Sequence, residues 1–189
     1  MSDRLTEEQI EQNKAEMISL VRGIKRKGIE GLCTWMSSSD FFYAPASTRH
    51  HGNFRGGLAA HSYEIYKEFD KQLDNFSIEV PQESRVLASF LHDACKIDLY
   101  VENTLKGGKT SEAKPYKIEE TFPFGHGERS AIIAQRHIEL TEQEAMLIRW
   151  HMGPYDKSYI DYKEAIEKTF PECVLFHHID HEVSLYRGL

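Results

Sequence analysis

Residues 86–96 read VLASFLHDACK, an apolar run that ends in an adjacent histidine and aspartate. The apolar residues predict a buried helix, which we expect to begin at Pro81 and to continue through His92 and Asp93 to about Ile97. A carboxylate and an imidazole are costly to bury unless something compensates their charge, and a divalent cation does so when further ligands converge on it. The pair therefore predicts a metal site inside a helical domain.

The rest of the chain has the pattern of further helices. Two segments, Thr6–Gln9 and Thr141–Glu144, are capping boxes, and each is followed by apolar residues at helical spacing. Other helices are expected from Leu58 to about Leu73, after Gly125, between Tyr155 and about Thr169, and from Pro171 onward.

Between Asp98 and Gly125 the helical pattern is replaced by short β-prone runs on either side of a Gly107-Gly108 turn. This pattern predicts a small β-hairpin. The expected fold is therefore all-α, a helical bundle with one β-hairpin insertion. No linker composition divides the 189 residues, so we expect one domain, in which residues 1–40 form a helical scaffold and residues 41–185 form the metal-binding core.

Composition limits the classes of function. The net charge of -7 argues against extended wrapping of nucleic acid, which requires many Lys and Arg side chains. No apolar run approaches the roughly 20 residues of a membrane span, and the start, Met1–Arg4, lacks the layout of a secretory signal. Three widely spaced cysteines fit a reducing compartment, and we expect a cytoplasmic protein without membrane association. A homo-oligomer is compatible with the sequence.

Six His and Asp side chains lie near expected helix ends or turns, where a bundle can bring them together. They are His61, His92, Asp93, His126, His151 and Asp180. Mixed His/Asp ligation suits one or two ions of Mn, Fe, Co, Ni or Zn, with Mg as a further option. For His126 and His151, helix capping or core packing is the alternative role.

Five successive motifs carry a resemblance to a known family: GGLAAH at 56–61, LHDACK at 91–96, GHGE at 125–128, WHMG at 150–153 and HHID at 177–180. They resemble the motifs of the HD-domain metal-dependent phosphohydrolase superfamily over about residues 41–185. The lead-in, Ala44-Pro45-Ala46 with His50-His51, is similar to the HD domain of a bacterial 3'-to-5' exoribonuclease. The chain has no room for the nucleic-acid-binding OB domain of that enzyme, so the resemblance implies a stand-alone HD protein.

The resemblance implies an HD-domain helical bundle with a first metal held by His61, His92, Asp93 and Asp180. Asp93 would also bind a second metal, to which His126 and His151 would be the added ligands. Lys96 matches the lysine that contacts substrate phosphate in binuclear members.

The chemistry of these residues gives the expected roles. Asp93, Lys96 and His126 are the candidate catalytic residues, and Arg55, Lys96 and His51 are the candidate substrate contacts. For Lys96 the alternative is a favourable position near a helix C-terminus, and for His51 and Arg55 it is a solvated turn. With one metal, His126 or His151 is free to act as a general acid. Cys95 is expected to pack in the core rather than to act as a nucleophile.

The leading hypothesis is a metal-dependent phosphohydrolase that uses metal-activated water to cleave a phosphoester of a nucleotide or a similar small metabolite. The expected partner is accordingly a small phosphorylated substrate. Two alternatives stay open: a 3'-to-5' phosphodiesterase or exonuclease on short RNA or DNA, and a non-catalytic sensor that binds a nucleotide.

Overall fold

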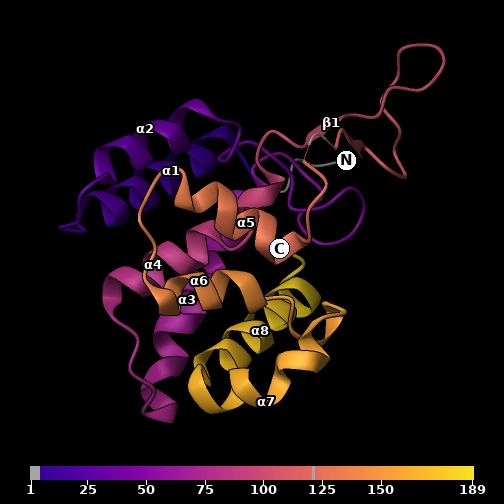
Figure 1. Cartoon of the computed structure of the whole chain (residues 1–189). Coiled ribbons are helices and arrows are strands. Elements are labelled where there is room, and N and C mark those ends of the chain that lie inside the picture. The colour runs from indigo at the N-terminus through magenta and orange to yellow at the C-terminus, as the bar shows by residue number, and fades with distance from the viewer. Residues whose placement is uncertain (1–4, 121) are drawn as a thin grey trace.

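The computed structural model describes residues 5–120 and 122–189. These residues are mostly helical with one small antiparallel sheet, which confirms the expected all-α fold with a hairpin (Figure 1). The helices are α1 (Glu7–Arg22), α2 (Ile29–Ser38), α3 (Gly57–Phe76), α4 (Gln82–Leu91), α5 (His126–Gln135), α6 (Glu142–Trp150), α7 (Tyr159–Thr169) and α8 (Glu172–Glu182). The shorter helical turns are η1 (Ala94–Lys96), η2 (Gly153–Tyr155) and η3 (Val183–Arg187).

Both predicted capping boxes are present at the starts of α1 and α6. The Thr6 hydroxyl accepts a hydrogen bond from the Gln9 amide, and the Gln9 side chain accepts one from the Thr6 amide. Thr141 and Glu144 make the same reciprocal pair. Each box satisfies two amide groups that the first turn of a helix leaves without a partner.

Four helices, α3, α4, α6 and α8, form a closed ring in which each helix contacts the next. Their inward faces carry fully buried apolar side chains, among them Phe69 on α3, Leu147 on α6 and Phe176 on α8. The rings of Phe69 and Phe176 meet edge to face, with centroids 4.9 Å apart. Helix α1 packs against α3 and α4 on one side of this ring, and α2 packs against α1 (Figure 1). Each ring helix carries, or ends beside, one of the predicted ligands: His61, His92, His151 and Asp180.

The helix expected to run to Ile97 ends earlier, and this is a correction to the predicted boundary. Helix α4 stops at Leu91, Asp93 leaves the helical region with φ -104° and ψ 23°, and the chain continues as the tighter turn η1. The Lys96 amide donates to the Asp93 carbonyl at 2.9 Å, as a 3-10 turn requires. This change of direction at Asp93 places its carboxylate among side chains from several helices.

The predicted hairpin is present, with β1 (Tyr100–Glu102) paired antiparallel to β2 (Tyr116–Ile118). Tyr100 lies opposite Ile118 in the register. The turn contains Gly107 and Gly108, both at positive φ, which glycine adopts without a steric penalty. The hairpin projects away from the helical body (Figure 1).

Two glycines allow close backbone approaches that position the site. A Cβ on Gly57 would lie 2.1 Å from the Gly52 carbonyl oxygen, so this glycine lets the loop that carries His51 pack against the start of α3. A Cβ on Gly127 would lie 2.0 Å from the Arg149 carbonyl oxygen. Gly127 therefore lets α5 approach the end of α6, which brings the rings of His126 and His151 to a centroid distance of 5.2 Å.

Asp40, just after α2, and Asp98, just after η1, join two segments by reciprocal hydrogen bonds. The Asp98 amide donates to Asp40 Oδ1 at 2.7 Å, and the Asp40 amide donates to Asp98 Oδ1 at 3.3 Å. Burial raises the pKa of Asp40 from 3.8 to about 6, and the negative charge of Asp98 adds to the increase despite the opposing amide donors. A proton on Asp40 therefore stabilises the contact between these two side chains.

Replacement of Asp40 with Asn is expected to flatten the pH dependence of stability. Because the folded chain holds the Asp40 proton more tightly than the unfolded chain, this group's contribution to stability is full below about pH 4 and is lost as the pH rises through about 6. After allowance for solvent screening, the wild-type protein should lose about 1 kcal/mol relative to Asp40→Asn between pH 4 and pH 7. Urea unfolding of both proteins at several pH values measures this difference, and parallel pH curves would contradict the prediction.

None of the helices in the described ranges is long and apolar enough to cross a membrane. Residues 1–4, on which the expectation about a secretory signal depends, lie outside the described residues.

Candidate metal centre

Asp93 lies at the centre of the predicted ligand set and is 2% exposed. Its two carboxylate oxygens face different groups of side chains. Oδ2 lies 3.4 Å from His92 Nε2 and 3.9 Å from His61 Nε2. Oδ1 lies 2.7 Å from His126 Nε2 and 3.7 Å from His151 Nε2. A carboxylate in this position can serve as a ligand to two cations at once.

The first group consists of His61, His92 and Asp180. Their ligand atoms all lie within 4.8 Å of one another, and His61 Nε2 is 3.2 Å from Asp180 Oδ1. They come from α3, the end of α4 and α8, so ring packing rather than sequence proximity brings them together. The two imidazoles are almost completely buried, at 1% and 0% exposure.

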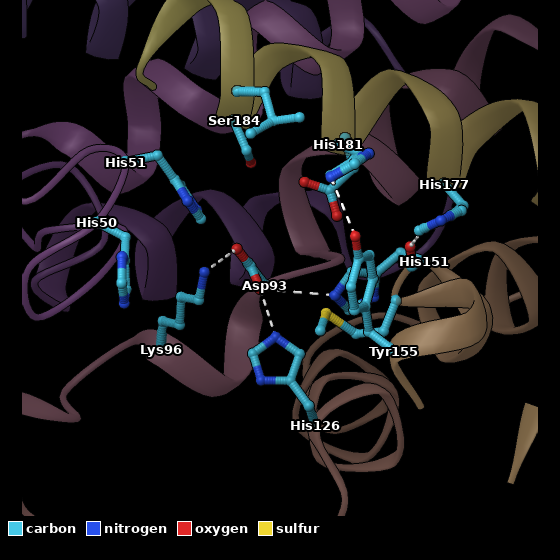
Figure 2. A pocket seen from close by; sticks show the side chains of 13 residues that line it. His50, His51, Asp93, Lys96, His126, His151, Tyr155, His177, His181 and Ser184 are labelled. Atoms are coloured by element: carbon cyan, nitrogen blue, oxygen red, sulfur yellow. Dashed lines mark hydrogen bonds and ion pairs between the residues drawn. The ribbon is translucent and has the colours of Figure 1, made fainter. Parts of the chain in front are cut away.

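The second group lies on the other side of Asp93 and involves α5 and the end of α6. His126 is the first residue of α5, and His151 directly follows α6. Asp93, Cys95 and His126 also place their ligand atoms within 4.8 Å of one another. The four predicted histidines thus surround the Asp93 carboxylate, and Asp180 joins them through His61. Figure 2 shows the interactions of Asp93 with His126 and His151.

Backbone carbonyls determine which nitrogen of two of these histidines is available as a ligand. A carbonyl only accepts hydrogen bonds, so His92 Nδ1 must donate to the Ser89 oxygen at 2.8 Å and His151 Nδ1 to the Ile148 oxygen at 2.7 Å. The opposite nitrogen, Nε2, has no hydrogen-bond partner among the described residues in either ring. Both rings therefore present Nε2 toward Asp93, in the arrangement that orients metal-binding histidines.

The carboxylates of the site are strongly biased toward the charged form. Burial raises the pKa of Asp93, but the charges of Lys96 and His92 outweigh it and hold that pKa well below its usual range. Burial also raises the pKa of Asp180, and the hydrogen bond and charge of His61 reverse the effect, which leaves this pKa below its ordinary value. Buried Asp93 and half-buried Asp180 both lie within 4 Å of His61 Nε2, so two negative charges at this end of the site favour a cation.

The histidines divide into charged and neutral forms. Burial lowers the pKa of His126, but the adjoining Cys95 and Asp93 outweigh burial and raise it to about 10. Burial and the charges of His92 and His126 lower the pKa of His151 to about 3, so its Nε2 lone pair is free at neutral pH. A cation that binds here replaces the protons on the charged rings.

Lys96 forms an ion pair with the central carboxylate. Its Nζ lies 2.6 Å from Asp93 Oδ2 (Figure 2), and the side chain is only 11% exposed. Burial lowers the pKa of Lys96, but the Asp93 charge dominates and raises it above its ordinary value. Lys96 therefore carries a positive charge at the position where the carboxylate meets the cavity.

A cavity of about 780 Å³ opens over Asp93. Lys96, His126 and His151 line it beside Asp93, and His50, His51, Tyr155, His177 and His181 complete the labelled wall (Figure 2). Met152 and Leu185 also belong to the lining. The Tyr155 hydroxyl lies 3.2 Å from His181 Nε2, and the Tyr155 side chain is 65% exposed. The volume suits a drug-sized or nucleotide-sized ligand.

The structure separates the three predicted substrate contacts. His51 and Lys96 line the cavity. Arg55 does not, because it pairs with Glu7 at 3.3 Å and stacks over the Tyr43 ring at 4.4 Å. This position does not agree with the prediction that Arg55 contacts the substrate. The pair with Glu7 instead connects the loop of Arg55 to the start of α1.

The cavity lining contains several residues that were not in the predicted site, among them Tyr155, His177 and His181. His177 Nδ1 donates to the His151 carbonyl at 2.8 Å, so it supports the turn that carries this ligand. Spacing gives a signal for His177 and His181: residues four apart on a helix share a face, and both flank Asp180. No comparable pattern marks Tyr155, which reaches the cavity through the turn η2.

The site chemistry fits a divalent transition metal. Imidazole and carboxylate donors from separate helices converge, and the buried Nε2 atoms of His92 and His151, which have no hydrogen-bond partner in residues 5–120 and 122–189, point toward a shared carboxylate. His61, His92, Asp93 and Asp180 would hold one ion, and Asp93, His126 and His151 a second.

Comparison with known proteins finds little similarity. No protein-family model matches the chain, and no solved structure matches it. The chain is 26% identical over 145 residues to a curated protein of Arabidopsis thaliana, "Histone acetyltransferase of the MYST family 1". The matched region covers 71% of this chain and 31% of that protein, so the chain spans less than a third of its length.

Proposed function

We propose that this protein is a metal-dependent phosphohydrolase that cleaves a phosphoester of a nucleotide or a similar small metabolite. The observation that carries the proposal is the position of Asp93, whose two oxygens face two groups of potential ligands at the base of a cavity. The resemblance of the motifs to HD-domain phosphohydrolases supports the same activity.

Metal ions bound by these residues would lower the pKa of a bound water and withdraw charge from the phosphoryl oxygens. Asp93 and Asp180 supply the negative charge that holds such ions. Lys96 lines the cavity and carries a positive charge. Its Nζ would leave Asp93 Oδ2 and bind a phosphate oxygen of the substrate. Where His126 is not a ligand, its half-buried ring can hold a proton for the leaving oxygen.

The residues that line the cavity favour a nucleotide as substrate rather than a simple sugar phosphate. Tyr155 offers an exposed aromatic face, and the side chains of Met152 and Leu185 give the same region apolar surface. A nucleobase stacks on such a face, and stacking of one base on an aromatic ring is worth roughly 1–3 kcal/mol.

A second candidate is cleavage at the 3' end of a short RNA or DNA. His50 and His51 line the mouth of the same cavity, where they can meet a second phosphate group. The net charge of -7 argues against a long nucleic-acid contact, so this activity would be limited to short oligomers.

The proposal is tested with chelator-treated protein reconstituted with Mn, Fe, Co, Ni, Zn or Mg. The panel contains nucleoside mono-, di- and triphosphates, base-free sugar phosphates and end-labelled oligonucleotides. We expect metal-dependent phosphate release, faster from nucleotides than from base-free phosphates by about tenfold or more.

Other outcomes separate the alternatives. Shortening of oligonucleotides with intact mononucleotides would favour the second candidate. Tight binding of a nucleotide without hydrolysis under any metal would contradict both activities and indicate a sensor. His178→Ala is the matched control, since His178 is an exposed histidine on α8 outside the cavity lining, and it should leave the rates unchanged.

A further inference from the structure

We propose that Cys95 is a thiolate ligand in the second metal subsite, together with Asp93 and His126, and that this subsite selects thiophilic cations such as Zn²⁺, Co²⁺ or Fe²⁺ over Mg²⁺ and Mn²⁺. The inference rests on the proposed metal centre and assigns to this centre a ligand that the predicted set of six does not contain.

The geometry around His126 is the first observation. Cys95 Sγ lies 3.4 Å from His126 Nδ1 and 3.6 Å from His126 Nε2, and His126 Nε2 also contacts Asp93 Oδ1. With bond lengths of about 2.3 Å for Zn–S and 2.0–2.1 Å for Zn–N, a tetrahedral ion separates these two ligands by about 3.6 Å. The Sγ–Nε2 separation already matches this value.

The surroundings of Cys95 distinguish it from the other two cysteines. Cys33, Cys95 and Cys173 are all buried. Cys33 and Cys173 belong to the main cluster of buried apolar side chains, which does not include Cys95. Cys95 instead has its sulfur against an imidazole and beside a carboxylate. This environment differs from the apolar packing that the sequence predicts for it.

A hydrogen bond from its backbone fixes the position of Cys95 relative to α5. The Cys95 amide donates to the buried Ser130 hydroxyl at 3.2 Å, and Ser130 lies one helical turn after His126. The turn η1 packs against α5 along this contact. Both donors are therefore fixed on segments that touch each other, as a preorganised ligand pair requires.

The cation preference follows from the donor atoms. Thiolate is a soft donor that favours Zn, Co or Fe, whereas Mg and Mn favour the oxygen atoms of carboxylates, carbonyls and water. Coordination would release the thiol proton of Cys95 and the proton that His126 shares with Asp93 to solvent, without any change of oxidation state.

The test is a Co²⁺ titration of chelator-treated protein, followed by absorption. The wild-type protein should develop a near-ultraviolet thiolate-to-cobalt charge-transfer band together with the visible bands of bound cobalt. Cys95→Ser should lose the charge-transfer band and bind one equivalent of Zn²⁺ tightly instead of two, with second-site affinity reduced by at least about 10- to 100-fold. Cys33→Ser should keep both properties.

The outcomes separate this proposal from the proposed function. Cobalt bound by the wild-type protein without a charge-transfer band would overturn the role of Cys95 and leave the metal centre standing. A wild-type protein that binds no cobalt would overturn the metal centre itself. A band that survives in Cys95→Ser but disappears in Cys33→Ser would also overturn the assignment. The wild-type spectrum decides the main question even where a variant is poorly folded.

Discussion

Asp93→Asn is expected to lose both metal ions and to hydrolyse substrate at least about 10³-fold more slowly than the wild-type protein. Asparagine keeps the size of the side chain but removes the negative charge. Because each oxygen of Asp93 faces one ligand group, a single substitution weakens both subsites. The rate falls steeply because a metal-bound water loses its proton near neutral pH, whereas bulk water keeps its proton at that pH.

Metal content measured by elemental analysis and phosphate release measured on the same samples check this prediction. Asp161→Asn is the matched control, since Asp161 is an exposed aspartate on α7 and makes the same chemical change away from the cavity. Asp93→Asn also leaves the buried Lys96 without its counter-ion, so a thermal unfolding curve must accompany the assay. A folded Asp93→Asn protein with wild-type metal content and rate would disprove the proposed metal centre.

Arg26→Met is expected to reduce the free energy of unfolding by about 3–5 kcal/mol, because it breaks a buried ion pair by removing one partner. Arg26 lies between α1 and α2, and its guanidinium donates to both carboxylate oxygens of Glu144 at 2.7 and 2.9 Å. It also contacts Glu83 on α4. Glu144 is completely buried, so loss of the guanidinium leaves a carboxylate with no opposite charge.

The remaining donors to Glu144 are the Ser84 hydroxyl and the Thr141 amide, which are neutral. Burial raises the pKa of Glu144, and in the wild-type protein the hydrogen bonds from Arg26 more than offset this effect, so that the pKa lies below its ordinary value. Without Arg26 the pKa should rise, and Arg26→Met should therefore be more destabilised at pH 8 than at pH 5.

Urea unfolding at both pH values measures the effect. Arg22→Met is the matched control, because the Arg22–Glu30 pair is exposed on both sides and such pairs contribute about 0–1 kcal/mol. Addition of Glu144→Gln to Arg26→Met should recover part of the loss, since no buried charge then remains. An Arg26→Met protein as stable as Arg22→Met would show that solvent, not Arg26, compensates Glu144.

Local signals in the sequence were sufficient for most of the fold. The capping boxes at Thr6 and Thr141 are short-range patterns with a defined hydrogen-bond geometry, and both are formed. The Gly107-Gly108 turn likewise marks the hairpin. These features depend on residues close together in the chain, so the sequence contains the physical information that specifies them.

The structure gathers the other five predicted metal ligands near Asp93, but the sequence left two features of the site and one buried ion pair outside it undetected. Helical periodicity continues past Leu91, so it gave no sign that the chain leaves the α-helix at Asp93. The contact of Cys95 with His126 joins residues 31 positions apart, and Arg26 reaches Glu144 across 118 positions. Such pairs depend on how helices pack, which a single sequence does not reveal.

For Arg55, the sequence predicted a contact with substrate that the structure does not contain. A basic residue in a Gly-rich loop beside predicted ligands is a reasonable phosphate contact, yet the side chain turns away to Glu7 and Tyr43. The direction of an arginine depends on which partner its long side chain can reach. The sequence alone does not show whether the Arg55 guanidinium binds a carboxylate on α1 or a phosphate in the cavity.

The ion pair of Lys96 with Asp93 has a consequence for the order of events during biosynthesis. Small zinc-binding domains have no stable fold before their metal arrives, because the free energy of metal binding supplies their folding free energy. Here the ammonium of Lys96 and protonated imidazoles already neutralise the buried carboxylates. With the proposed metal centre, a newly made chain would fold with the Lys96 ammonium in place before a metal ion binds, so that the supply of metal would limit activation rather than folding.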